Sequence, residues 1–189
     1  MGTSNENLQF RVATLDNAAQ IQQLVQSAFR AEDSRENWTG DMALASRFSI
    51  KVEEIASNIA KPDSAFLMAI DENGSLIGSV CVSKRSTGLG RISMLAVDPR
   101  RHRGGLGRKI LSNAEEYCQR AWGVGRIGLN ALSSRHELIA WYMRRGYQKT
   151  GGLTQFPREW FAGLTLPDDL CFVELEKDLD TAHGIAETV

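Results

Sequence analysis

Cysteine is scarce in this sequence and follows no metal-binding pattern. The three cysteines, Cys81, Cys118 and Cys171, lie far apart in 189 residues, and no CxxC spacing occurs. This spacing argues against a disulfide framework and against a structural zinc site. We therefore expect the thiols to be reduced and mostly buried as small apolar residues, and we expect no metal site.

Long apolar runs and an excess of either charge are also absent. No uninterrupted apolar stretch approaches the roughly 20 residues of a membrane-spanning helix. The N-terminal segment MGTSNENLQF lacks the basic start and apolar core of a secretory signal. The 22 basic and 23 acidic residues leave a net charge of -1, which provides no broad basic surface for a nucleic acid. We expect a cytoplasmic protein with no membrane partner and no nucleic-acid partner.

The length of 189 residues predicts a single domain, residues 1–189. Apolar periodicity predicts that it contains both helices and strands. Strands are expected at 10–15, 65–70, 76–83, 91–97, 126–131, 147–150 and 170–175. Helices are expected at about 16–28, 52–61, 106–122 and 134–145. Ser134 and Glu137 have the spacing of a capping box at the start of the last helix. The strand, helix, strand order over 91–131 implies one right-handed parallel crossover in an otherwise antiparallel sheet.

The stretch 94–111, MLAVDPRRHRGGLGRKIL, combines an apolar strand, a proline, a basic glycine-rich turn and the start of a helix. Gly104, Gly105 and Gly107 lack Cβ atoms, so consecutive backbone N–H groups at the positive end of the helix are able to bind a pyrophosphate. The alternative is a flexible basic turn that only begins a helix. Two common nucleotide motifs do not fit, because Ile110 occupies the third glycine position of a dinucleotide fingerprint and no GK[ST] sequence occurs.

Two motifs resemble those of the GNAT superfamily of N-acetyltransferases. The family's cofactor motif is a strand ending in Val-x-Pro, followed by Arg or Gln, two residues, Gly, one residue, and Gly or Ala. Residues 97–99 (VDP) and 102–107 (HRGGLG) follow this motif, with His102 where the family has Arg or Gln. Residues 141–147 (WYMRRGY) are similar to the family's Leu-Tyr-Glu-Lys-Leu-Gly-Phe helix end. The resemblance covers about residues 10–175.

The resemblance implies an α/β (α+β) GNAT-like fold. Its central sheet would be mixed and mostly antiparallel, with about six or seven strands flanked by about four helices. The fourth and fifth strands would be parallel and splayed. Acetyl-CoA, the expected cosubstrate, would bind between these two strands, which are 91–97 and 126–131 in this chain.

The resemblance also implies which residues bind acetyl-CoA. The backbones of Leu95, Ala96 and Val97 would pair with the pantetheine arm like an added strand, and the N–H of Leu95 or Ala96 would polarise the thioester carbonyl. The turn would bind the pyrophosphate through Arg103, Gly104, Gly105, Leu106, Gly107 and Arg108. The reaction would be direct attack of a neutral amine on the thioester within a ternary complex.

Tyr142 occupies the position of the family's general-acid tyrosine, which protonates the departing thiolate. The alternative is an ordinary aromatic with a polar tip on an amphipathic helix. Asn130 stands where some relatives have a glutamate base, and we group it with the cofactor-site residues. Its amide would bind a water or the substrate. The alternative is that it satisfies strand-edge backbone groups. Proton removal would pass through water to a carboxylate such as Glu53, Glu54, Asp168 or Asp169.

The acceptor is the part that the sequence determines least. The family builds its acceptor pocket from the first helices and the loop between the last strands, here 30–54 and an aromatic-rich insertion at about 151–169. Trp38, Phe156, Trp160 and Phe161 would either line such a pocket or lie in a homodimer interface. The expected activity is acetyl transfer to a small amine, an amino acid or a peptide amine. The alternatives are a non-catalytic acyl-CoA binding or sensing domain and a partner-binding domain.

Overall fold

The seven strands of the protein form one mixed sheet, in the order β1-β2-β3-β4-β5-β7-β6. The structure is a computed structural model that describes residues 8–33, 35, 38–101 and 104–179. The strands are β1 Gln9–Val12, β2 Ser64–Ile70, β3 Leu76–Ser86, β4 Leu89–Val97, β5 Arg126–Leu132, β6 Gln148–Gln155 and β7 Cys171–Asp178. All neighbouring strands are antiparallel except β4 and β5, which are parallel. This arrangement confirms the expected fold class.

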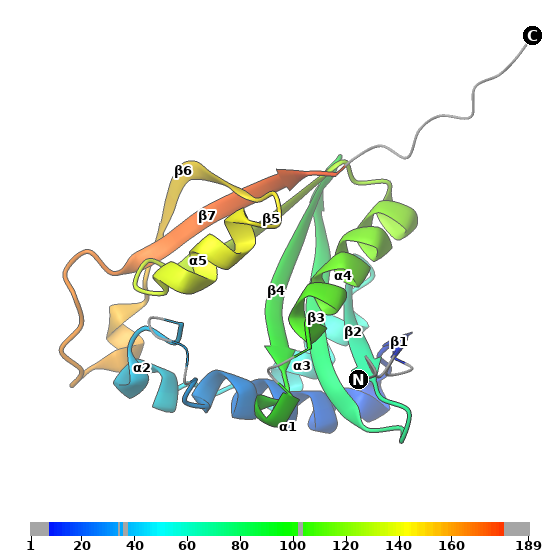
Figure 1. The fold of residues 1–189 in the computed structure, drawn as a ribbon, viewed down its shortest axis with the longest axis horizontal. Helices are drawn as coiled ribbons and strands as arrows, with labels where there is room; N and C mark the ends of the chain where they lie inside the picture. The colour runs from blue at the N-terminus through cyan, green and yellow to red at the C-terminus, as the bar shows by residue number, and fades with distance from the viewer. Residues whose placement is uncertain (1–7, 34, 36–37, 102–103, 180–189) are drawn as a thin grey trace, which may run out of the picture.

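Helices cover both faces of the sheet (Figure 1). The α-helices in the described residues are α1 Ala18–Arg30, α2 Met42–Ser46, α3 Val52–Ala60, α4 Leu106–Trp122 and α5 His136–Met143. The apolar sides of α1 and α3 pack on one face, where they bury Phe66 and Met68 of β2. The apolar sides of α4 and α5 pack on the other face, which includes Leu67 of β2. Because β2 is buried on both faces, its sequence is a continuous apolar run rather than an alternating one.

The hairpin between β2 and β3 turns at Asn73-Gly74, a residue pair typical of tight turns. Gly74 adopts a φ of 80°, and its N–H donates to the carbonyl of Asp71 over 3.0 Å. The carboxylate of Asp71 accepts the backbone N–H groups of Asn73 and Ser75 at 3.0 and 2.9 Å. These hydrogen bonds and the positive φ of Gly74 hold the turn between the two strands.

The expected capping box at the start of α5 is wrong. The N-cap residue is Arg135, and no side chain makes a cap hydrogen bond there. Because α5 begins at His136, Glu137 is the second helical residue, one position too early to complete a capping box. The Ser134 hydroxyl is buried without a hydrogen-bond partner and lies against Gly40.

The segment 151–169 is more ordered than its sequence predicts. Its first residues continue β6, in which Leu153 and Gln155 pair with Val173 and Cys171 of β7. Every residue of β6 is exposed, so no alternation of apolar side chains marks the strand in the sequence. A short 3₁₀ helix, Arg158–Phe161, follows.

The described residues hold no helix that is long and apolar enough to cross a membrane. Within the same residues, no group of three or more His, Cys, Asp or Glu side chains is able to hold a metal ion. All three cysteines are free; Cys81 and Cys118 are buried, and Cys171 is partly exposed. Burial raises the pKa of the Cys81 thiol and raises the pKa of the Cys118 thiol to about 12, so neither is a reactive thiolate at neutral pH.

Candidate active site

The parallel strands β4 and β5 pair only at their beginnings and then separate (Figure 1). Leu89, Gly90 and Arg91 lie opposite Arg126, Ile127 and Gly128. From Ile92 to Val97, no strand of the described residues pairs with the β5-facing edge of β4. The backbone groups on this edge are therefore available to a ligand that binds in an extended conformation.

A bulge in β4 lies beside this open edge. Ser93 and Ala96 pair with Cys81 and Ser79 of β3, so that Met94 and Leu95 both lie opposite one residue. Met94 has a φ of 49°, a left-handed conformation that non-glycine residues adopt at a cost of about 1 kcal/mol or more. Such bulges often occur next to active sites, where they redirect side chains and backbone groups.

The glycine turn follows β4 and ends at the N-terminus of α4. Gly104 and Gly105 have φ values of 106° and 74°, which side chains of L-residues rarely adopt. Apart from their neighbours in the chain, no described residue has an atom within 4 Å of the position that a Cβ would occupy on either glycine. The N-terminus of α4, with the N–H groups of its first turn, thus lies beside an open space and next to the exposed Arg108. His102 and Arg103 lie outside the described residues.

Two carboxylates hold the beginning of this turn in place. Asp98 accepts the backbone N–H of Arg100 at 2.9 Å and its guanidinium at 3.1 and 2.8 Å. The hydrogen bond from the Arg100 side chain is the main reason that the pKa of Asp98 is lowered. Asp71 accepts the guanidinium of Arg101 at 3.0 Å. Arg100 and Arg101 therefore have structural partners, and the basic charge of the turn is smaller than its sequence suggests.

Helix α5 meets both the glycine turn and the end of β4. A Cβ on Gly107 would lie 3.6 Å from the Trp141 ring and 3.8 Å from Val97. The Trp141 ring contacts that of Tyr142 edge to face, with centroids 5.0 Å apart. The open edge of β4, the first turn of α4 and Tyr142 therefore lie around one region, although they come from three separate parts of the sequence.

The phenol of Tyr142 is protonated at neutral pH. Its ring is buried between Trp141 and Tyr147, whose centroids lie 5.0 and 5.7 Å away. Burial raises the pKa of Tyr142 to about 12, against the opposing effect of the positive charges of Arg135 and Arg145. A phenol in this state is able to donate a proton to an anion that forms beside it.

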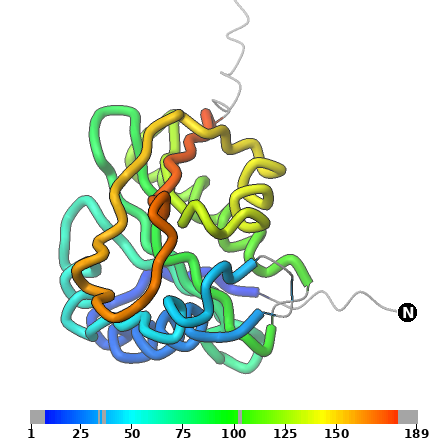
Figure 2. The backbone as a smooth tube through the Cα atoms, turned by 90° about the vertical axis from the view of Figure 1, so that its left-hand side faces the viewer, coloured from blue at the N-terminus to red at the C-terminus, as the bar shows by residue number. Residues whose placement is uncertain are grey.

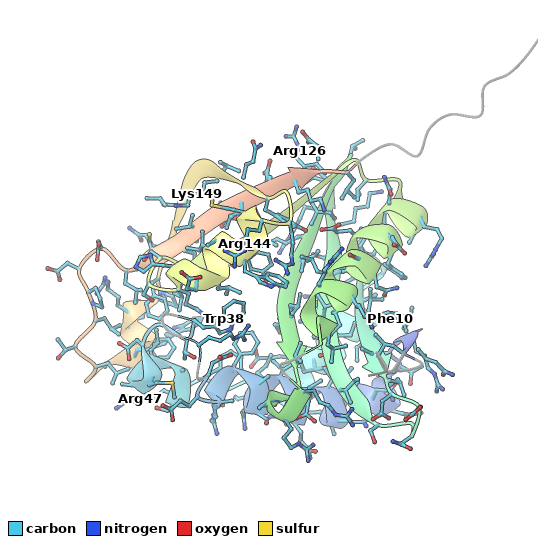
Figure 3. All side chains as sticks on the ribbon, in the orientation of Figure 1. Phe10, Trp38, Arg47, Arg126, Arg144 and Lys149 are labelled. Carbon is cyan, nitrogen blue, oxygen red and sulfur yellow. The ribbon has the colours of Figure 1, made fainter. Side chains whose placement is uncertain are left out.

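The segment before α2 reaches α5 through Trp38, which Figure 3 shows beneath that helix. The Trp38 carbonyl accepts a hydrogen bond from Nε of Arg135 at 2.9 Å. The Trp38 ring lies edge to face with that of Trp141, with centroids 6.2 Å apart. Burial lowers the pKa of the Arg135 guanidinium, whose positive charge faces Tyr142. Trp38 thus joins the N-terminal helices to the helix that carries Tyr142.

A carboxylate that the sequence did not single out lies on the other side of the sheet, at the point where β4 and β5 separate. Glu174 of β7 pairs with Asn130 of β5 and accepts the Asn130 side-chain amide at 3.2 Å. The same carboxylate accepts Thr154 of β6 at 2.9 Å and Arg91 of β4 at 2.9 Å. If β7 is known to pair with β5, the alternation of strand side chains places Glu174 on the same face as Asn130. The sequence alone does not reveal that pairing.

The four carboxylates expected as proton acceptors, Glu53, Glu54, Asp168 and Asp169, are exposed. A Glu54 oxygen accepts the backbone N–H of Lys51 at 3.3 Å. Asn130 has a defined partner in Glu174 rather than in strand-edge backbone groups. Leu95 and Val97 pack against the core on the α4 side, whereas Ala96 is buried on the opposite side, since the bulge reverses the alternation of β4.

The aromatic residues of the insertion have two different environments. Phe156 is buried and lies against Phe161 and Phe172, with ring centroids 5.1 and 5.8 Å away. Together with Leu44 of α2 they form a small hydrophobic core, and Figure 2 shows the orange segment after β6 beside the cyan α2. Trp160, by contrast, is 77% exposed. Phe156 and Phe161 therefore join the insertion to α2 of the same chain.

Comparisons with known proteins agree with this geometry. The model of the "Acetyltransferase (GNAT) family" matches residues 20–147. The chain is 30% identical to the mycothiol acetyltransferase of Salinispora tropica over 90 residues, which are 46% of this chain and 29% of that protein. It is 29% identical to the mycothiol acetyltransferase of Salinispora arenicola over 99 residues, which are 50% of this chain and 32% of that protein. These matches span about a third or less of the length of the two relatives.

The fold is also that of solved GNAT structures. The ribosomal-protein-S18-alanine N-acetyltransferase from Escherichia coli superposes with a TM-score of 0.68 at 16% sequence identity, over 94% of this chain and 97% of that chain. The family model covers more than half of the chain, and the matched residues include both the glycine turn and α5. The chain therefore belongs to the GNAT family of acetyltransferases.

Proposed function

We propose that the protein transfers the acetyl group of acetyl-CoA to a primary amine. The observation that carries this proposal is the separation of β4 and β5 beside the bulge, with the glycine turn at one end of the open edge and Tyr142 beside it. A family member that only binds acyl-CoA would need the edge and the turn, but not a protonated phenol.

The open edge and the turn fit the two ends of acetyl-CoA. The amide groups of the pantetheine arm would pair with the backbone of Leu95, Ala96 and Val97. The pyrophosphate would bind the N–H groups at the start of α4, together with the side chains of Arg103 and Arg108. Gly104 and Gly105 are suited to this role because no described group fills the space where their side chains would otherwise stand.

The chemistry assigned to this chain is positioning and proton transfer. Acetyl-CoA supplies an activated thioester, whose C–S bond breaks as the amine nitrogen bonds to the carbonyl carbon. A backbone N–H of Leu95 or Ala96 would stabilise the negative charge that develops on the carbonyl oxygen. Tyr142 would donate its phenolic proton to the departing sulfur, and the nitrogen would release its own proton to water or to a carboxylate.

The activity predicts thiol release that depends on an amine. The protein should release a thiol from acetyl-CoA in the presence of at least one member of a panel of alkyl amines, amino acids and short peptides with free N-termini, and the acetylated product should be detected by mass spectrometry. Acetyl-CoA binding, measured by calorimetry in the same buffer, is the control. Binding without thiol release on any amine would favour the acyl-CoA binding or sensing alternative.

The state of Tyr142 predicts that activity does not fall at alkaline pH. Since the pKa of this phenol is raised to about 12, it keeps its proton throughout the usual assay range. We expect kcat/KM to rise as the ammonium group of the acceptor loses its proton, and not to fall up to at least about pH 10. A descending limb with an apparent pKa below ~10, after correction for spontaneous thioester hydrolysis, would contradict a role for Tyr142 as the acid.

A further inference from the structure

We propose that Glu174 binds the amine that attacks the thioester, with a free lone pair of its carboxylate accepting an N–H of the acceptor. This inference rests on the proposed transferase activity and names the residue that recognises the acceptor. It follows from where Glu174 lies, from how its oxygens are occupied and from the charge that surrounds it.

Glu174 lies at the point where the sheet opens. Arg91 is the last residue of β4 that pairs with β5, and its partner there is Gly128. Asn130 lies two positions further along β5, after the strands have separated, and Glu174 is directly opposite it on β7. A group held by Glu174 would therefore lie at the vertex of the two splayed strands, beside the closed end of the open β4 edge.

Glu174 also faces the side of the sheet opposite to α4 and α5. Its neighbours Val173 and Leu175 belong to the core that α4 and α5 cover, so alternation directs Glu174 to the face on which α1 and α3 lie. The glycine turn leads into α4 on the first face. A cosubstrate that enters from α4 and an acceptor that enters from the α1 side would meet between β4 and β5.

The carboxylate of Glu174 has room for one more donor. Its Oε1 accepts two hydrogen bonds, from Asn130 at 3.2 Å and from Thr154 at 2.9 Å, whereas Oε2 accepts Arg91 at 2.9 Å. A carboxylate offers about four acceptor positions, so one position on Oε2 is left by these three contacts. The side chain is 23% exposed, which allows a small ligand to reach it.

The surroundings keep this carboxylate ionised. Partial burial raises the pKa of Glu174, but the hydrogen bonds from Arg91, Thr154 and Asn130 outweigh that effect and leave the pKa below its usual value. A carboxylate with a lowered pKa is a weak base, but it is a good hydrogen-bond acceptor for an ammonium ion or an amine N–H. The acceptor class that it fits is a primary alkyl amine, which enters as its ammonium ion and loses a proton to water before attack.

The test compares Glu174→Gln with Glu176→Gln on the amine that the wild-type protein acetylates best. Glu176 lies on the same face of β7 and is also paired with an arginine, Arg126, at 3.5 Å, but it lies opposite Gly128, where β4 and β5 are still paired. We expect Glu174→Gln to lower kcat/KM for the amine about 10- to 100-fold, the loss of one charge-assisted hydrogen bond, with KM for acetyl-CoA unchanged. Glu176→Gln should stay within about twofold of the wild type.

A second variant separates binding from structural support. Glu174→Gln leaves Arg91 without its carboxylate, so the double variant Arg91→Gln, Glu174→Gln removes both charges together. If Glu174 binds the amine, the double variant keeps the wild-type melting temperature and the low kcat/KM. Recovery of kcat/KM in the double variant, or equal effects of Glu174→Gln and Glu176→Gln, would overturn the role of Glu174 and leave the transferase activity intact. Absence of amine acetylation by the wild type, with acetyl-CoA bound, would instead overturn the proposed function itself.

Discussion

Replacing Tyr142 with phenylalanine is expected to lower kcat by about 10²- to 10⁴-fold. The substitution removes only the hydroxyl, so the ring keeps its contacts with Trp141 and Tyr147. The departing thiolate then has to take its proton from water instead of from a phenol held beside it. The dissociation constant of acetyl-CoA should change little, because the open β4 edge and the glycine turn are untouched.

Tyr117→Phe is the matched control for this prediction. Tyr117 is a partly buried tyrosine of α4 that packs against Trp122, with ring centroids 5.6 Å apart. Its variant should keep the wild-type kcat. Single-turnover measurements of thiol release with the amine in excess would isolate the chemical step. A Tyr142→Phe enzyme with the same single-turnover rate as the wild type would remove Tyr142 from the mechanism.

The glycine turn of the proposed cofactor site was predictable because it depends on local sequence. Glycines at 104 and 105 permit positive φ values, and the apolar strand and amphipathic helix on either side are recognisable from periodicity alone. The role proposed for Tyr142 rests on the family resemblance, since nothing else in its sequence neighbourhood distinguishes a general acid from a packing residue. The arrangement of these parts around one region required the fold.

The acceptor half depends on strand pairing, which the sequence does not encode locally. Glu174 reaches the proposed acceptor site because β7 enters the sheet between β5 and β6, and this order places three side chains from three strands around one carboxylate. The bulge at Met94 could not be predicted from the sequence either. Positive φ values are expected at glycine or asparagine, and not at methionine. The exposed strand β6 begins at the strand predicted for 147–150, but it lacks the alternation that would have revealed its extension to Gln155.

The packing of α4 on the sheet gives the second large prediction, because it fixes the helix whose N-terminus begins the proposed pyrophosphate site. A Cβ on Gly78 of β3 would lie 2.3 Å from Cδ1 of Ile110 and 3.2 Å from the carbonyl oxygen of Ala96. Ile110 is only 1% exposed, so its side chain has little room to move away. Gly78→Ala should therefore lower the free energy of unfolding by about 1–3 kcal/mol, measured by urea denaturation, and should weaken acetyl-CoA binding.

A double-mutant cycle with Ile110→Val tests the reason for this loss. Valine lacks the Cδ1 atom that meets the new methyl group, and Ile110→Val alone should cost about 0.5–1.5 kcal/mol. The double variant should be more stable than the sum of the two single effects predicts, by at least ~0.5 kcal/mol. Gly128→Ala is the control, since a Cβ there meets nothing closer than 3.7 Å and should leave stability unchanged or raise it by up to about 1 kcal/mol. Additive effects of Gly78→Ala and Ile110→Val would show that this contact does not set the position of α4, and that another part of its interface with the sheet does.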